Sequence, residues 1–156
     1  MHPEHRLHEL GLRVPEPPPA VANYVGAVRS GNLLFVAGHG PFEEGKPTFI
    51  GKLGRDLDVA EGRRSAQLVA LNMLATIKAE LGDLDRVTRV VKLLVLVNSM
   101  PDFGDQPQVA NGASDLLVDI FGEERGRHAR SAVGMGALPF GISVEIEGVF
   151  EVESGA

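Results

Sequence analysis

The residue of this sequence best suited to bind a small anion is Arg130. It begins a run in which apolar residues alternate, the pattern of a half-buried strand, and its own face of that strand carries only Ala132, Gly134 and Gly136. A guanidinium group donates two parallel hydrogen bonds to a planar carboxylate, and small neighbours leave space for a ligand beside it. The pattern also fits a salt-bridged arginine at a strand end. From the residues alone, a carboxylate clamp and a structural arginine both stay open.

Other side chains that could do chemistry are spread along the chain. Glu145 and Glu147 share one face of the last predicted strand, where a charged edge in water would also explain them. Tyr24 is the single tyrosine and lies where the first predicted strand begins, a place where tyrosine usually packs. His39, between two glycines, and His128 could transfer protons near neutral pH. The sequence identifies no carboxylate that would orient either histidine.

Cysteine and the common catalytic motifs are absent from the sequence. Without cysteine there is no disulfide, thiolate nucleophile or cysteine metal site. No GxSxG, GxxxxGK[ST] or HExxH occurs, and the GMG of residues 134–136 lies inside a predicted strand with no helix after it. His2, His5 and His8 lie three apart, so a metal site there is conceivable, although solvated terminal histidines explain the spacing as well. We therefore expect no metal and no organic cofactor.

Composition favours one globular domain in the cytoplasm. The chain has 156 residues, 44% of them hydrophobic, and a formal net charge of -6 without a basic block, which counts against nucleic acid as a partner. Its longest apolar run, residues 90–97, is broken by Lys92 and is far shorter than the roughly 20 residues that cross a bilayer. The N-terminus lacks the apolar region of a secretory signal. We expect neither a membrane nor a nucleic-acid partner.

Residues 1–20 are predicted to form an N-terminal extension, and residues 21–156 a single domain. Pro3 to Leu10 could form two helical turns that end at Gly11, and the proline-rich residues 15–19 are then extended.

The first half of the domain predicts a hairpin, a loop and a helix. Apolar runs on both sides of Gly31 predict the hairpin, and a polar, glycine-rich loop follows it as far as Leu57. Asp58 and Glu61 have the spacing of a capping box, so a helix begins there, and it ends before Gly82.

The second half predicts a buried strand, a helix and two further strands. Residues 86–99 form the strand, and their stretch 93–97 is apolar at every position, which is typical of strands covered on both faces. The second helix runs from Asp105 or Pro107 to Phe121, and the next glycine ends it.

A turn signal at residues 138–141 separates the last two strands. A simple hairpin there would pair Glu145 with Gly134 and leave Arg130 about 13 Å away along the strand. No direct pair of Arg130 with Glu145 within one chain is therefore expected.

The element order is β-β-α-β-α-β-β, an α+β arrangement. Two helices can cover only one face of such a sheet, yet the stretch 93–97 is apolar on both of its faces. We therefore expect an oligomer that buries sheet against sheet.

Three stretches, NYVGAVRSGNLLFVAGHGP, VTRVVKLLVLVNSMPDFGDQPQVANGASDLLVDIFG and RHARSAVGMGALPFGISVEIEGVF, together resemble the reactive intermediate deaminase family, also called RidA/YjgF or L-PSP. The resemblance covers about residues 20–152. Its most specific parts are Ala-Arg-Ser at 129–131, Leu-Pro at 138–139 and Val-Glu-Ile-Glu at 144–147. It is strongest to a longer branch of the family that carries an N-terminal extension.

The resemblance implies a chorismate-mutase-like fold, with a mixed sheet and two helices on one face, assembled as a homotrimer with a ligand cleft at each subunit interface. Arg130 matches the arginine that holds the substrate carboxylate, and Glu145 a glutamate that positions water. Ala132 matches a residue that offers its backbone N–H, while Tyr24 and Gly38 match residues that line the cleft. We expect residues 1–20 to pack along the subunit rim and to reshape the mouth of the cleft.

The implied reaction is hydrolysis of a 2-enamino or 2-imino acid to the 2-keto acid and ammonia, without a cofactor. Two positions depart from the family. Ala37 stands where a serine or threonine is common, and His39 where many members carry glutamine. We keep His39 and His128 as further substrate-binding candidates. Because alanine has no hydroxyl, a non-catalytic trimer that binds a small carboxylate metabolite stays open, whereas an endoribonuclease fits the negative charge poorly.

Overall fold

The structure, a computed structural model, describes residues 1–19 and 22–155 and contains the predicted hairpin. Strand β1 (Ala27–Ser30) pairs antiparallel with β2 (Leu33–His39), and Gly31 makes the turn with a φ of +62°. In the predicted loop after β2, a second, small hairpin joins β3 (Phe42–Glu43) to β4 (Lys46–Pro47). Its two turn residues, Glu44 and Gly45, both have positive φ, as a two-residue hairpin turn of this type requires. Glu-Gly is not one of the residue pairs that usually mark such a turn, so the hairpin was not predicted from the sequence.

Helix α2 (Val59–Leu81) has the predicted ends. The Glu61 backbone N–H donates to Asp58 Oδ1 at 2.8 Å, and the Asp58 N–H donates to Glu61 Oε1 at 3.1 Å, which completes the capping box. Gly82 ends the helix with a φ of +85°, the left-handed conformation that favours glycine. Both predictions are confirmed.

The next elements form a parallel crossover. After the short 3-10 helix η1 (Leu84–Arg86), strand β5 (Val87–Asn98) leads into α3 (Gln106–Gly126) and then into β6 (Ala129–Met135). Strand β6 lies parallel to β5, so these three elements are a βαβ unit. Gly122 has a non-helical backbone at the predicted stop of α3, but the prediction that the helix ends there is wrong, because one more helical turn follows as far as Gly126.

The last strand overturns the predicted hairpin. Strand β7 (Val144–Val152), which follows the 3-10 helix η2 (Pro139–Gly141), pairs with β2 on one side and β5 on the other, so the sheet order is β1-β2-β7-β5-β6. Val144, Ile146 and Phe150 of β7 are buried, and a central position buries such side chains best. Strand β6, with its arginine and glycines, occupies the edge, where those residues are tolerated.

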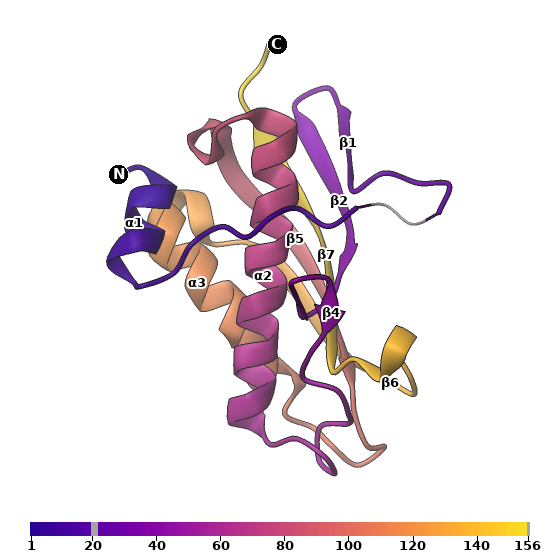
Figure 1. Cartoon of the computed structure of the whole chain (residues 1–156). Helices are drawn as coiled ribbons and strands as arrows, with labels where there is room; N and C mark the ends of the chain where they lie inside the picture. The colour runs from indigo at the N-terminus through magenta and orange to yellow at the C-terminus, as the bar shows by residue number, and fades with distance from the viewer. Residues whose placement is uncertain (20–21, 156) are drawn as a thin grey trace.

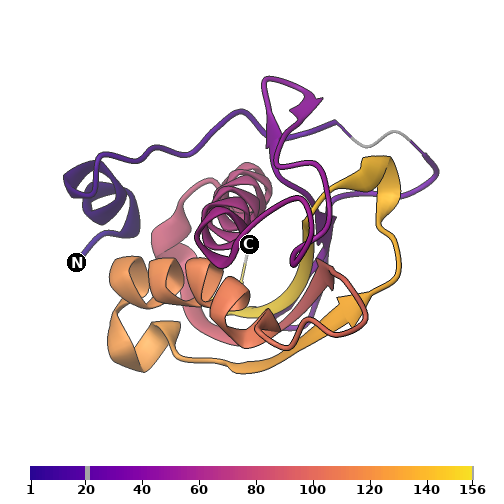
Figure 2. The ribbon, with the colours of Figure 1, turned by 90° about the horizontal axis from the view of Figure 1, so that it is seen from below.

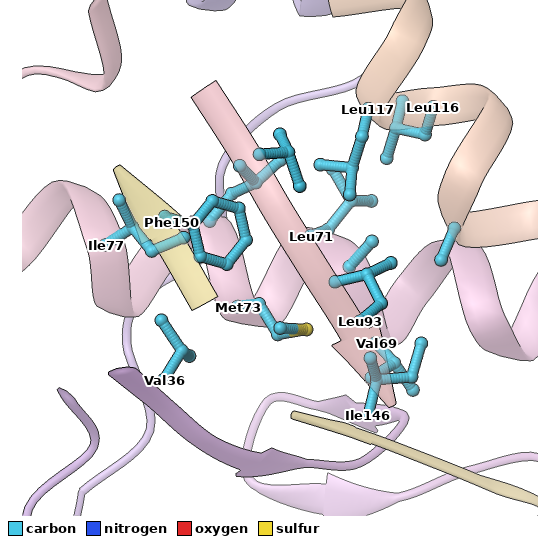
Figure 3. Packing of buried hydrophobic residues seen from close by; sticks show 14 of the residues in the cluster. Val36, Val69, Leu71, Met73, Ile77, Leu93, Leu116, Leu117, Ile146 and Phe150 are labelled. Atoms are coloured by element: carbon cyan, nitrogen blue, oxygen red, sulfur yellow. The ribbon is translucent and has the colours of Figure 1, made fainter. Parts of the chain in front are cut away.

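Helices α2 and α3 cover one face of the mixed sheet (Figure 1). Seen from below, the sheet curves around them (Figure 2). Apolar side chains of the sheet and of both helices fill the layer between, as Figure 3 shows for Val36, Leu93, Ile146 and Phe150 of the sheet and for Val69, Ile77 and Leu117 of the helices. The α+β architecture with two helices on one face is confirmed.

The other face of the sheet is also apolar, as predicted. Val28 and Phe35, which pair in register on β1 and β2, are 54% and 45% exposed. Val133 and Met135 of β6 are 43% and 36% exposed on the same face. These apolar side chains therefore lie near both edges of the uncovered sheet face.

The N-terminal helix is part of the packed core. Helix α1 (Pro3–Glu9) lies beside α3 in both ribbon views (Figures 1 and 2), and it ends one residue before the predicted end. Its Leu7 is 1% exposed within the main hydrophobic cluster. At its start, the His2 ring lies 2.8 Å from Asp83 of the loop after α2. This segment therefore has both an apolar and a polar attachment to the rest of the chain.

A pair of leucines in the N-terminal segment tests this attachment. Leu7→Ala removes a fully buried side chain and should lower the free energy of unfolding by about 2–5 kcal/mol. Leu10→Ala removes the same group from a side chain that is 38% exposed and should change it by about 0.5 kcal/mol or less. Urea denaturation of both variants measures the difference, and equal losses would mean that α1 does not belong to the core.

Candidate active site

Arg130 contacts two polar residues of α3. Its Nη1 donates to Asn111 Oδ1 at 2.8 Å and to Ser114 Oγ at 3.2 Å. Asn111 and Ser114 are three residues apart, so they share one face of α3, and the parallel crossover places that face against β6. Neither residue was predicted from the sequence. The available signal was a pair of polar residues at helical spacing beside the apolar stripe of the helix.

His128 extends this group. Its Nε2 lies 2.8 Å from Ser114 Oγ, and its Nδ1 lies 2.6 Å from the Gly126 carbonyl oxygen. Burial lowers the pKa of His128 and the charge of Arg130 lowers it further, although the Gly126 carbonyl acts in the opposite direction. The imidazole is therefore neutral at pH 7. Since a carbonyl oxygen only accepts, Nδ1 carries the proton and Nε2 accepts from the Ser114 hydroxyl.

The small residues predicted beside Arg130 are present on its strand. Ala132 alternates with Arg130 and packs partly buried against the core, and Gly134 follows it at the same spacing. The arginine thus lies between polar groups of α3 and a stretch of β6 with little side-chain volume.

Glu145 belongs to a second group, on the other face of the sheet. A Cβ atom at Gly38 would lie 2.8 Å from Glu145 Oε2, so the carboxylate rests against the Gly38 backbone. Burial raises the pKa of Glu145, and the neighbouring charge of Glu147 raises it further. A carboxylate with a raised pKa is a stronger base than an exposed one.

Tyr24 lies just before β1 and is 53% exposed. The Gly26 carbonyl accepts a hydrogen bond from the Ala37 N–H at 2.9 Å, so the segment that carries Tyr24 continues the β1–β2 pairing towards Gly38. The structure therefore brings Gly38 and Glu145 together, with Tyr24 in a neighbouring segment.

His39 points to the opposite side, into the core. Its Nδ1 donates to the Ala37 carbonyl at 2.6 Å, and its Nε2 lies 2.7 Å from Thr76 Oγ1 on α2. Burial lowers the pKa of His39, and the bond to Ala37 only partly opposes this. Both ring nitrogens have protein partners, and the ring does not face the Glu145 carboxylate.

One chain does not bring Arg130 and Glu145 together. Arg130 pairs in register with Leu93, which is 1% exposed beneath the helices, and Glu145 pairs with Leu96. Residues 93 and 96 are three apart on one strand, so they point to opposite faces of the sheet. The two groups would meet on one ligand only if different subunits supplied them.

The described residues also contain an open hollow of about 530 Å³ elsewhere, at the carboxyl end of β5. None of the candidate residues lines it. Lys52 crosses it, donating from Nζ to Asn98 Oδ1 at 2.8 Å and to the Gly136 carbonyl at 2.6 Å. These bonds tie the loop after β4 to the ends of two strands.

Among the described residues, the three histidines near the N-terminus do not form a metal site. His2 caps α1 and contacts Asp83, and His5 lies 3.3 Å from Glu9. Over residues 1–19 and 22–155, no three histidine or acidic side chains gather closely enough to hold a metal ion. Across that same range, every helix is too short or too polar to span a lipid bilayer.

The fold and these groups define the class of protein: a chorismate-mutase-like α+β domain with an arginine at the edge of its mixed sheet. The family model described as "YjgF/chorismate_mutase-like, putative endoribonuclease" matches residues 4–146. The chain belongs to the YjgF/RidA family.

Two relatives match nearly the whole chain. Protein TCP17 of Trypanosoma cruzi is 48% identical over 148 residues, 95% of this chain and 92% of that protein. The crystal structure of Atu1372, a protein of unknown function from Agrobacterium tumefaciens, is 50% identical and covers 97% of this chain and 92% of that one, with a TM-score of 0.91. In each comparison fewer than 20 residues of this chain are left unmatched. Both relatives therefore match at least part of residues 1–20.

A more distant structure shares the fold. Escherichia coli TdcF with bound serine is 22% identical, covers 89% of this chain and 94% of its own, and has a TM-score of 0.61.

His39 makes a pH-dependent contribution to stability that can be measured. Because its pKa is lowered from the ordinary value of 6.5, the unfolded chain binds the proton more readily. This contribution is therefore complete above the unfolded pKa and is lost as the pH falls below it. We expect His39→Gln to lose less unfolding free energy than the wild type between about pH 7 and about pH 5.

Chemical denaturation at several pH values measures this loss. His8→Gln, a change at an exposed histidine of α1, is the control and should keep the wild-type dependence. If His39→Gln retained the wild-type dependence as well, His39 would not be a buried neutral histidine.

Proposed function

We propose that this protein is a hydrolytic deaminase that converts reactive 2-enamino and 2-imino acids to 2-keto acids and ammonia. It acts as a homotrimer, with Arg130 of one subunit and Glu145 of the next on each side of an interface cleft. The arginine holds the substrate carboxylate, and the glutamate activates the attacking water. The site needs no metal and no organic cofactor.

The observation that carries this proposal is that Arg130 has only neutral hydrogen-bond partners among the described residues. Both of its hydrogen-bond partners, Asn111 and Ser114, are neutral, and no carboxylate of the described residues lies within ion-pair distance. In such surroundings no acidic side chain compensates the charge of the half-buried guanidinium, and a ligand carboxylate would do so. A structural arginine at a strand end would instead be expected to pair with an acidic residue.

The chemistry then needs one base and one oriented water. Glu145, with its raised pKa, takes a proton from the water as the oxygen attacks the C=N carbon. Glu145 passes this proton to the nitrogen of the tetrahedral adduct and then transfers the proton of the new hydroxyl group to the same nitrogen. The C–N bond breaks as the C=O bond forms, and ammonia and the 2-keto acid are released. An imine carbon is already electrophilic, so positioning of the carboxylate and the water supplies most of the acceleration.

Two features support the assembly. Arg130 and Glu145 lie on opposite faces of one sheet, so a site that uses both requires a second subunit. The open face carries Val28, Phe35 and Val133, and packing this face against another subunit would remove them from water. TdcF, which shares the fold, has been described with bound serine, a small amino acid whose carboxylate resembles that of the proposed substrates.

A second function is favoured by Ala37. Many family members carry a serine or threonine hydroxyl at this position, which alanine cannot supply. The Ala37 carbonyl already accepts a hydrogen bond from His39. If that hydroxyl is required for turnover, the trimer would bind a small carboxylate metabolite through Arg130 and act as a sensor. Binding of 2-keto acids without turnover distinguishes this function from the deaminase.

Arg130→Ala should remove most of the activity. We expect kcat/KM for 2-iminopropanoate, generated in situ by a partner enzyme and followed by semicarbazide trapping, to fall about 30-fold or more, since losing one partner of a charged pair costs about 2 kcal/mol or more. Arg127→Ala is the matched control, because Arg127 is an exposed arginine three residues earlier that pairs with Glu123. It should retain the wild-type rate.

Three results would change this assignment. Wild-type protein that does not accelerate loss of the imine would reject the deaminase, and pyruvate binding that depends on Arg130 would then favour the sensor. Equal activity of Arg130→Ala and wild type would show that Arg130 does not belong to the site.

The pH profile tests the role of Glu145. Glu147→Gln removes the negative charge that helps to raise the pKa of Glu145, so the acidic limb of the kcat/KM profile should move to lower pH. Glu151→Gln, on the same face of β7 but near its far end, should leave that limb in place. An acidic limb that does not move in Glu147→Gln would argue against Glu145 as the base.

A further inference from the structure

The groups around Arg130 form a chain of hydrogen bonds with a single direction. The Nδ1–H of His128 donates to the Gly126 carbonyl, so Nε2 of the neutral ring is left as an acceptor. The Ser114 hydroxyl hydrogen then goes to Nε2, and the Ser114 oxygen accepts from Arg130 Nη1. Each group thus donates to the next, an arrangement in which hydrogen bonds strengthen one another.

The backbone fixes the far end of this chain. A Cβ atom at Gly126 would lie 2.7 Å from the Leu117 carbonyl oxygen and 2.7 Å from Val118 Cα, so only glycine allows the chain to pass so close to α3. This close approach holds the Gly126 carbonyl rigidly opposite His128. The tautomer of His128 is therefore set by the fold and does not depend on a mobile side chain.

The other residues of this hydrogen-bond chain are His128, Arg130 and Ser114. His128 comes immediately before β6 and Arg130 is the second residue of that strand, and both side chains contact the Ser114 hydroxyl on α3. A serine hydroxyl rotates to suit its partners, and here one acceptor fixes its hydrogen while one donor fixes its lone pairs. Ser114 can then hold the guanidinium in one orientation.

We propose that Ser114 and His128 are positioning residues for Arg130, which together orient its guanidinium so that its remaining N–H groups meet a ligand carboxylate in one geometry. This inference rests on the proposed binding of a carboxylate by Arg130. It adds that His128 acts through Ser114, and that neither residue touches the substrate.

The test measures the binding of pyruvate, a 2-keto acid product, by calorimetry. Ser114→Ala and His128→Phe should each raise the Kd about 5- to 10-fold, the loss expected for one hydrogen bond of ordinary strength. His128→Gln keeps an acceptor on a side chain of similar reach and should restore most of the affinity. Thr88→Val is the control, because it removes a hydroxyl that donates to Glu151 near the start of β5, away from Arg130.

A spectroscopic readout separates positioning from a merely structural role. Imidazole ¹⁵N spectra should show His128 protonated at Nδ1, and pyruvate should shift the Nε2 resonance although the ligand does not touch that ring. The Ser114→Ala variant should lose this response, because the hydroxyl that connects the ring to Arg130 is gone. A structural role alone would leave the His128 signals insensitive to ligand in the wild type.

The outcomes distinguish this inference from the proposed function. If Arg130→Ala abolishes pyruvate binding while Ser114→Ala and His128→Phe remain within twofold of the wild type, the positioning role is rejected and the carboxylate site stands. If Arg130→Ala binds pyruvate normally, or if the wild type does not bind it, the carboxylate site itself fails, and this inference fails with it.

Discussion

The position of β7 between β2 and β5 is the arrangement on which the rest of the structure depends. Val144, Ile146 and Phe150 are buried against the helices, and each such side chain contributes about 1.5–3 kcal/mol. With β7 in the centre, β6 must pair with the free side of β5 and become an edge. Arg130 lies on that edge strand and is half-buried.

The same pairing divides the candidate chemistry between two surfaces. Arg130 turns towards α3, where neutral oxygens of Asn111 and Ser114 offset part of the cost of removing a cation from water. Glu145 turns to the open face, where burial and a second carboxylate make it a stronger base. In the function that we propose, this hydrogen-bonded cation and this base are the two halves of one site, supplied by different subunits. The open apolar face is a surface that could bring such halves together in an oligomer.

The two histidines that the sequence placed in the site have different surroundings. His128 joins Arg130 through Ser114, whereas His39 bonds Thr76 and lies in the core beneath the sheet. Both rings are fixed by a backbone carbonyl two residues earlier, Gly126 for the first and Ala37 for the second. The local geometry of the two histidines is thus similar. They differ in the helix that packs against the ring, and only His128, which contacts α3, is connected to Arg130.

The sequence alone determined what depends on neighbouring residues. The capping box at Asp58, the turn at Gly31 and the alternation that places Glu145 opposite Ile146 all follow from local hydrogen bonding and periodicity, and the resemblance supplied the family and its arginine. Tertiary structure decided which strands became neighbours. Periodicity fixes the face of a strand but not its partner, so a hairpin of the last two strands was equally compatible with the pattern. For the same reason the sequence could not reveal that α3 would lie against β6, which is what gives Arg130 its neutral partners.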